Sequence, residues 1–237
     1  MDTRMKEILN AFKNNKLTPD SSFRFHCTQC GKCCINRDDI ILSPLDLFRI
    51  AKELNLSMEE VLKQYCEWYI GIESRFPTVS LKPRGSIRRC PFLKNHRCMV
   101  QKAKPAVCAM FPIGRAALFD TENKDDSQGP AVEYFYTNPG CGDNAKTQTV
   151  REWFDLFNIP IKDEFFVAWS TFQMKLIGLL AEAEGTFGKT VMPQLWSPIF
   201  GILYLCYNPE EEFYPQFQEN TEKLLEGLQM ILDRKVG

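Results

Sequence analysis

Residues 27–34 read Cys27-Thr28-Gln29-Cys30-Gly31-Lys32-Cys33-Cys34, so four of the ten cysteines of the chain fall within eight residues. Cysteines crowd this closely for one of three reasons: a metal or iron–sulfur site, a disulfide knot, or thiol–disulfide exchange. Two C-x2-C steps end in a vicinal pair, and Gly31 leaves the backbone between the steps free to curl. We therefore expect a loop in which several sulfur atoms point toward one place.

The composition is that of a globular protein that can bury a substantial core. The chain has 237 residues, of which 44% are hydrophobic and 25% are charged, and it contains 18 phenylalanines. This length suits one large domain or two small ones. The formal net charge of −1 argues against a protein built mainly to coat nucleic acid or an anionic membrane.

The sequence predicts a cytoplasmic protein without a membrane span. The first residues, Met1 to Glu7, lack the apolar stretch of a secretory signal. The longest apolar run, around residues 195–206, is interrupted by Pro198 and Gly201 and is too short to cross a bilayer. Because stable disulfides are rare in the cytosol, ten cysteines there favour metal binding over a disulfide framework.

Helices are predicted at both ends of the chain and after the cysteine run. An amphipathic helix is expected at residues 2–16, and Ser43-Pro44 supplies an N-cap and a first helical residue for another helix. Ser57 opens the capping box of a third helix. Apolar residues at helical spacing then predict long helices at residues 163–184 and 209–235.

Short strands are predicted in the cysteine-bearing part of the chain. Strand-like patterns mark residues 78–82, 116–119 and 132–136, and residues 90–100 should fold back as a hairpin around Lys94-Asn95-His96. The fold class that follows is α+β, with a small, irregular, cysteine-rich module of short strands and a mainly helical C-terminal part.

A change in composition near residue 145 divides the chain. Residues 1–145 are expected to form a cysteine-cluster, metal-binding region, and residues 146–237 a helical C-terminal region. The two regions are either separate domains or parts packed as one body, and the sequence does not choose between these arrangements.

Eight cysteines are the candidate metal ligands. Each of the four beyond the first run lies in a turn marked by proline or glycine, where exposed backbone N–H groups can hydrogen-bond to sulfur. The candidate ligands are Cys27, Cys30, Cys33, Cys34, Cys90, Cys98, Cys108 and Cys141. Cys66 and Cys206 lie in apolar contexts that look helical, and we expect both to be small buried hydrophobes.

Metal binding is the interpretation that these thiols favour, and two chemistries stay open. Zinc takes four nitrogen or sulfur ligands, so eight cysteines could supply two structural sites. The C-x2-C-x2-C pattern also opens the motif of a bacterial 4Fe–4S cluster, for which Cys90-Pro91 offers a distant fourth ligand. The vicinal pair Cys33-Cys34 would serve two metals or one bridged cluster. Thiolate-only ligation excludes magnesium and calcium.

Other polar residues near the cysteines are assigned simpler roles. His26 and His96 adjoin cysteine motifs, and with eight thiols available we expect them beside the site or at the surface. Asp38-Asp39 should lie in a solvated turn. Arg88-Arg89 either offset thiolate charge or form an exposed pair. The basic stretch at residues 82–97 has no interleaved aromatic platform, which argues against nucleic-acid binding.

The spaced cysteine motifs resemble those of a known family. The order Cys27-x2-Cys30-Gly31-x-Cys33-Cys34, Cys90-Pro91-Phe92-Leu93, Cys98, Lys104-Pro105-x2-Cys108-x2-Phe111-Pro112 and Gly140-Cys141 is similar to that of the YkgJ-type CxxCxxCC cysteine-cluster family. The resemblance covers about residues 24–142. It implies that the eight cysteines chelate zinc or iron, a 4Fe–4S cluster included.

The same family includes flagellin lysine methylases, which extends the resemblance to redox or methyl-transfer chemistry by analogy alone. Family members often carry arginine where this chain has Lys104 and Ala109, so a role for those arginines does not carry over.

Three functions are consistent with the residues. A metal- or cluster-binding protein without catalysis of its own is favoured by thiol-only ligands and the lack of a separate acid–base set. The alternative is a cluster- or zinc-dependent enzyme for redox or group transfer. The third is a metal-folded module whose C-terminal helices bind a protein partner. The expected partners are thus a metal ion or cluster and, for the third function, another protein.

Overall fold

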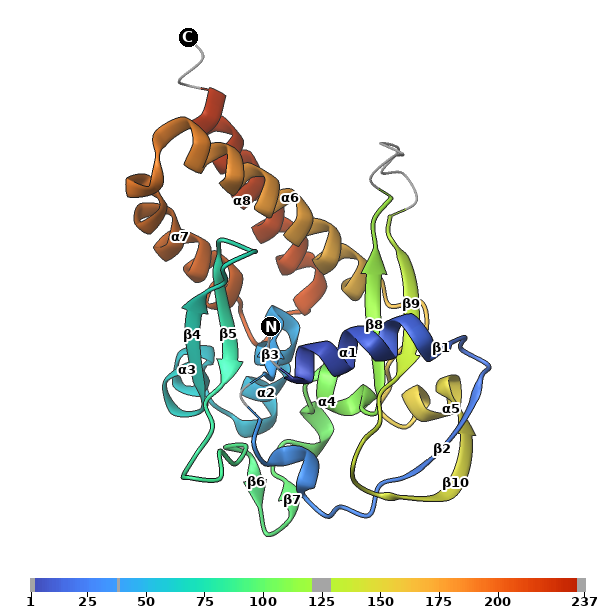
Figure 1. Cartoon of the computed structure of the whole chain (residues 1–237). Coiled ribbons are helices and arrows are strands. Elements are labelled where there is room, and N and C mark those ends of the chain that lie inside the picture. Colours follow the sequence, from blue (N-terminus) through green and yellow to red (C-terminus); the bar gives the residue numbers. More distant parts are fainter. Residues whose placement is uncertain (1–2, 38, 121–128, 234–237) are drawn as a thin grey trace. The chain divides into compact units, whose positions relative to one another are not determined.

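The computed structural model describes residues 3–37, 39–120 and 129–233 (Figure 1). The chain forms two compact units that are interleaved along the sequence. Unit 1 comprises Met1–Ile40 and Pro83–Val167, and unit 2 comprises Ile41–Lys82 and Ala168–Gly237. The α+β class is confirmed by small antiparallel sheets together with helices. The division into residues 1–145 and 146–237 stays a prediction.

Unit 1 combines short helices with three small sheets. Its elements are α1 (Thr3–Asn14), β1 (Lys16–Leu17), β2 (Ser22–His26), η1 (Lys32–Cys34), β6 (Leu93–Lys94), β7 (Arg97–Cys98), η2 (Gln101–Ala103), α4 (Ala106–Met110), β8 (Ile113–Leu118), β9 (Ala131–Tyr136), β10 (Asp143–Thr149), α5 (Val150–Asp155) and the first turn of α6 (Glu164–Phe187). The strands pair in the orders β1-β9-β8, β10-β2 and β6-β7, all antiparallel.

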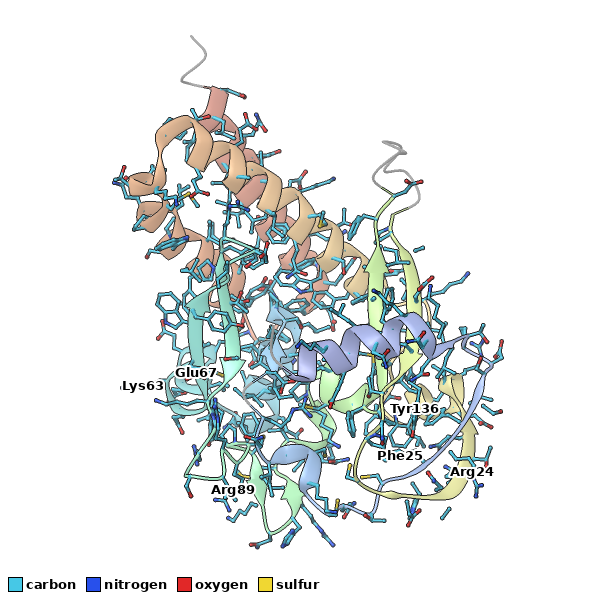
Figure 2. The ribbon with its side chains drawn as sticks, in the orientation of Figure 1. Arg24, Phe25, Lys63, Glu67, Arg89 and Tyr136 are labelled. Atoms are coloured by element: carbon cyan, nitrogen blue, oxygen red, sulfur yellow. The ribbon has the colours of Figure 1, made fainter. Side chains whose placement is uncertain are left out.

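The core of unit 1 is rich in aromatic residues, and side chains of β2, α4 and α5 contribute to it. Strand β2 alternates, so that Phe23 and Phe25 are buried while their neighbours face solvent. The indole of Trp153 on α5 packs edge-on against Phe25, with ring centroids 5.6 Å apart. Its Nε1–H donates to the carbonyl of Met110 on α4, at 3.0 Å. This core therefore fixes β2, which ends just before Cys27, and α4, which contains Cys108 (Phe25 is labelled in Figure 2).

Unit 2 joins a small sheet to long helices. Its elements are β3 (Ile41–Leu42), α2 (Pro44–Leu54), α3 (Met58–Tyr65), β4 (Cys66–Ile70), β5 (Pro77–Leu81), the rest of α6, η4 (Lys189–Val191), α7 (Met192–Tyr204) and α8 (Phe213–Asp233). The strands pair in the order β3-β5-β4. A second aromatic cluster joins α6 to α8, where the rings of Phe172 and Phe217 pack edge-on with centroids 6.4 Å apart.

Local sequence signals account for most of these elements. The caps of α2 and α3 are confirmed, because Ser43 and Ser57 each accept a hydrogen bond from the third helical residue in a complete capping box. The terminal and long helices appear as α1, α6 and α8, and the hairpin appears as β6–β7. The stretch from Asp120 to Gly129 is polar and reads as a loop in the sequence, but most of it lies outside the described residues.

The strands β2, β4 and β10 are among those that were not predicted. β2 and β10 pair with each other across a register shift, and β10 is exposed along most of its length, so it has no alternating pattern. β4 begins at Cys66, directly after α3, where the helical pattern was expected to continue. Cys66 is buried as predicted, but the prediction for Cys206 was wrong. α7 ends before it, and Cys206 lies exposed in the following loop.

Within the ranges that the structure describes, none of the helices is both long enough and apolar enough to span a bilayer.

Candidate metal centre

The first cysteine run folds as a tight loop after β2. Gly31 adopts a left-handed conformation, with φ of 73°, and starts the short helix η1. The N–H of Cys34 then donates to the carbonyl of Gly31 at 3.0 Å. This turn leaves the sulfur atoms of Cys33 and Cys34 3.9 Å apart. Two thiolates on one tetrahedral ion with bonds of about 2.3 Å would be separated by about 3.8 Å. The vicinal pair can therefore reach the same ion.

A short backbone ladder brings Cys90 to this loop. The N–H of Cys90 donates to the carbonyl of Cys34 at 2.8 Å, and the N–H of Asn36 donates to the carbonyl of Ile87 at 3.1 Å. These hydrogen bonds join segments that lie far apart in the sequence, and they place Cys90 beside the vicinal pair.

Cys98 and Cys108 come from neighbouring elements of unit 1. Cys98 lies on β7 and pairs with Leu93 of the β6–β7 hairpin. The side chains of Leu93 and His96 pack 3.6 Å from the position that a Cβ of Gly31 would occupy, so the hairpin lies against the first loop. Cys108 lies on α4, where its N–H donates to the carbonyl of Pro105 at 2.8 Å.

Cys141 lies in a turn between two glycines, Gly140 and Gly142. Gly142 has a φ of 70°, and a Cβ there would lie 2.5 Å from the carbonyl oxygen of His26. Only glycine permits this close approach, which sets Cys141 beside the end of β2. Cys141 also acts on Tyr136, which is labelled in Figure 2. Burial raises the pKa of the Tyr136 phenol, and the nearby charge of Cys141 raises it further.

The thiols interact as one connected set. Backbone N–H groups of Lys32 and Gly142 lower the pKa of Cys30. A hydrogen bond between the side chains of Cys30 and Cys141 contributes to the raised pKa of Cys141. A hydrogen bond from Cys34 lowers the pKa of Cys33, and the same bond raises the pKa of Cys34. Cys33 is electrostatically linked to both sides of the site, to Cys30 and Cys141 and to Cys34 and Cys98.

The surroundings raise the pKa of four further candidate thiols, Cys90, Cys98, Cys108 and Cys141. Burial raises the pKa of Cys90 and Cys98 and raises that of Cys108 to about 12. Burial, followed by the charges of Cys33, Cys30 and Cys27, raises the pKa of Cys141 to about 11. Neutral buried thiols of this kind lose their protons when a cation supplies the missing positive charge.

Two basic side chains face the cysteines, and the sequence pattern singled out neither as a charge partner. The buried guanidinium of Arg37 donates through Nη1 to the carbonyl of Cys33 at 3.3 Å and through Nε to Asp39 at 2.6 Å. Arg37 and Lys104 both favour the thiolate forms of Cys33 and Cys108. Arg88 and Arg89, for which the sequence allows either charge compensation of the thiolates or an exposed pair, are both exposed. The signal for Arg37 was its position three residues after the vicinal pair.

The two histidines lie at the protein surface. His26 is exposed and contacts Asp143, with Nδ1 3.3 Å from Oδ1, and His96 is exposed at the hairpin tip. Asp39 pairs with Arg37, and Asp38 lies outside the described residues.

The cysteines converge but are not arranged as a finished ligand shell. In the described part of the chain, which contains all eight candidates, no three Cys, His, Asp or Glu side chains stand where they could hold one metal ion. All eight are free thiols in unit 1, held by backbone contacts that leave the side-chain torsions to adjust. The donor set, sulfur with nearby positive charge, fits a soft or borderline metal.

Comparison with known proteins agrees with this donor set. Residues 26–130 match the CxxCxxCC family. Its description is "Putative zinc- or iron-chelating domain". This CxxCxxCC segment contains seven of the eight candidate cysteines, and Cys141 lies beyond its end. The resemblance is confirmed, although the match is shorter than the expected residues 24–142.

A curated relative shares the same region. An uncharacterized protein of the archaeon Methanocaldococcus jannaschii is 31% identical over 105 residues, which is 42% of this chain and 52% of the relative. The chain thus spans about half the length of that relative. No solved structure matches the chain.

Proposed function

We propose that unit 1 binds zinc or iron through the thiolates of the eight candidate cysteines. The observation that carries this proposal is their convergence. The loop of Cys27 to Cys34, the hairpin, α4 and the turn at Cys141 are separate in sequence, yet their thiols share one electrostatic environment. The match of residues 26–130 to a family described as zinc- or iron-chelating supports it.

The ligand chemistry centres on Cys33 and Cys34. Their sulfur atoms are already at the separation that a shared ion requires, and Cys90 is tied to the same loop by backbone. Arg37 and Lys104 offset part of the negative charge that several thiolates create. A bound ion or cluster would supply a cross-link between these segments, or redox or Lewis-acid chemistry if one coordination position stays open.

Metal analysis of the Cys30→Ser variant tests the proposal. The wild-type protein, purified without oxygen, should carry zinc or iron in stoichiometric amount, and Cys30→Ser should lose most of it because the serine hydroxyl is a much weaker ligand for these metals. Cys206→Ser is the matched control, since Cys206 is an exposed thiol in unit 2. Visible absorbance separates the chemistries, because an iron–sulfur cluster is coloured and a zinc protein is not.

Two outcomes would count against metal binding by these residues. One is a wild-type protein with less than about 0.2 equivalents of any transition metal. The other is an equal loss of metal from Cys206→Ser and Cys30→Ser.

Arg37→Met should weaken metal binding by about tenfold, because groups that hydrogen-bond around a metal site typically change its affinity by 10- to 100-fold. Methionine keeps much of the buried volume while it removes the charge beside Cys33 and the hydrogen bond to its carbonyl. Competition against a coloured chelator measures the change. Arg151→Met, which removes an exposed arginine paired with Asp20, is the control. An affinity for Arg37→Met within twofold of wild type would contradict the role given to Arg37.

A further inference from the structure

The outer strand of the unit 2 sheet exposes a row of backbone hydrogen-bonding groups. In the order β3-β5-β4, β4 pairs on one side only among the described residues. The N–H of Lys82 donates to the carbonyl of Tyr65 at 2.8 Å, and the N–H of Gly71 donates to that of Phe76 at 3.2 Å. Antiparallel ladders alternate, so the odd-numbered residues between these two bonds face β5. The N–H and C=O groups of Trp68 and Ile70 therefore point away from the sheet.

This edge has few of the features that usually protect an edge strand, and its single charged residue is Glu67. Such strands are commonly kept short or interrupted by lysine, proline or a bulge. The opposite edge follows this rule, since β3 has two residues and is followed by Pro44 within three positions. β4 instead has five residues, Cys66 to Ile70, in unbroken register with β5 and without lysine or proline. Within this sheet, β4 is therefore the edge that is open to a further strand.

Large apolar side chains are concentrated along the same edge. Trp68 is 56% exposed, Tyr69 is 45% exposed and Ile72, just after the strand, is 93% exposed. Because Trp68 and Tyr69 project to opposite faces of the sheet, apolar surface is exposed on both sides of this edge.

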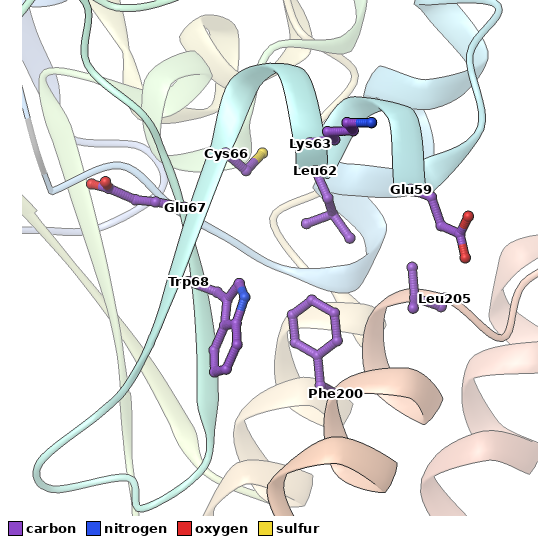
Figure 3. Close-up of a pocket in the computed structure, with 8 residues that line it drawn as sticks. All are labelled: Glu59, Leu62, Lys63, Cys66, Glu67, Trp68, Phe200 and Leu205. Atoms are coloured by element: carbon purple, nitrogen blue, oxygen red, sulfur yellow. The ribbon is translucent and has the colours of Figure 1, made fainter.

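A cavity of about 380 Å³ lies beside β4 within unit 2. Figure 3 shows the indole of Trp68 beside the ring of Phe200 of α7 in the lining of this cavity. The rest of the lining mixes apolar and charged side chains: Leu62, Cys66, Leu205, Glu59, Lys63 and Glu67. The two rings have centroids 5.4 Å apart and planes tilted by 44°. Side chains alternate along a strand, so Ile70 lies on the same face of β4 as Cys66 and Trp68. This face and the free edge together offer backbone groups and a pocket.

We propose that β4 pairs with β4 of a second copy of this chain, antiparallel and centred on Trp68. A two-fold axis through such a pair places Trp68 opposite the same residue of the other copy, in a hydrogen-bonded position. Each Trp68 N–H then donates to the Trp68 carbonyl across the axis. Ile70 falls opposite Cys66 of the other copy, and the Ile70 N–H donates to the Cys66 carbonyl across the axis. The reverse hydrogen bond does not form, because the Cys66 N–H already donates to the carbonyl of Leu62 at the end of α3.

The side chains of β4 are complementary to themselves in this register. Glu67 falls opposite Tyr69, so no two like charges meet, and the two Trp68 rings pack against each other. Ile70 of one copy falls opposite Cys66 of the other, at the mouth of the cavity. An unrelated partner strand would have no reason to match in this way, which is why a second copy is the occupant that we assign. The pairing does not depend on metal binding by unit 1.

Sedimentation of the full chain in reductant tests the pairing, with reductant present because Cys27 and Cys206 are exposed thiols. Wild type should be a monomer at about 1 µM and mainly a dimer at about 200 µM. The affinity is expected to be weak because a contact made by the edge of one five-residue strand falls at the small end of specific interfaces. Trp68→Lys should be monomeric throughout, since it sets two lysines opposite each other. Tyr69→Lys is the matched control and should stay dimeric, because its lysine falls opposite Glu67.

A charge-swap mixture distinguishes lost pairing from lost folding. Trp68→Lys and Trp68→Glu should each be monomeric alone and should form a heterodimer when mixed in equal amounts. A wild-type protein that stays monomeric at about 200 µM would overturn the proposal, and such a result would leave a different extended polypeptide as the partner of this edge. A dimer that survives Trp68→Lys, or one that Tyr69→Lys abolishes, would overturn it as well.

Discussion

Removal of metal by a chelator, in reductant and without oxygen, should unfold much of unit 1 and lower its free energy of unfolding by several kcal/mol. The elements that carry the cysteines are very short: β6 and β7 have two residues each, η1 has three and α4 has five. Such elements have little stability of their own, so the energy of metal binding becomes energy of folding. Amide hydrogen exchange measures the effect, and the amides around Cys98 and Cys108 should lose protection.

Unit 2 provides the internal control for this experiment. Its helices α2 and α8 are held by aromatic packing, with Phe48 and Phe213 centroids 5.2 Å apart, and none of the eight candidate ligands lies in it. Protection in α8 should therefore persist in the chelator, and added zinc or iron should restore protection in unit 1. Unchanged exchange around Cys98 and Cys108 after complete metal removal would contradict a folding role for the metal.

Trp153→Ala should destabilise unit 1 by about 4 kcal/mol, which is the usual cost of truncating a large buried aromatic. The indole is buried, packs against Phe23 and Phe25 and donates to the Met110 carbonyl. Because Phe25 precedes Cys27 and Met110 follows Cys108, the same variant should also bind metal more weakly. Urea unfolding and metal analysis measure the two effects.

Two tryptophan variants serve as controls. Trp153→Phe keeps most of the packing and loses only the Nε1–H hydrogen bond, so it should cost about 1–2 kcal/mol. Trp196→Ala removes a half-buried indole from unit 2 and should leave the metal content unchanged. The link between core and metal site would be wrong if Trp153→Ala unfolded more easily but bound metal with full affinity.

Elements with a local cause could be predicted from sequence. Ser43 and Ser57 cap helices through side chains that act within one turn, and the apolar stripe of residues 213–232 packs as α8 along its buried face. The β6–β7 hairpin is also local, since two strands of two residues are joined by a tight turn. In each case the residues that decide the structure lie within a few positions of one another.

Elements with a distant cause could not be predicted. β10 is a polar, exposed segment that becomes a strand because β2, more than a hundred residues earlier, pairs with it. The place of Arg37 beside Cys108 is of the same kind, because it results from the ladder between residues 34–37 and 87–90. The cysteine spacing identified the candidate ligands, whereas their grouping around Cys33 depends on contacts between remote segments.

The interleaving of the two units has a consequence for how the protein is made. Unit 1 is split around Ile41–Lys82, so a ribosome releases the first four thiols well before Cys90, Cys98, Cys108 and Cys141 emerge. During that interval the early thiols lack the four later cysteines and are open to oxidation or to premature capture of an ion. Metal delivered after release of residue 141 would meet the complete set, so timing of supply, as well as affinity, should govern the yield of correctly loaded protein.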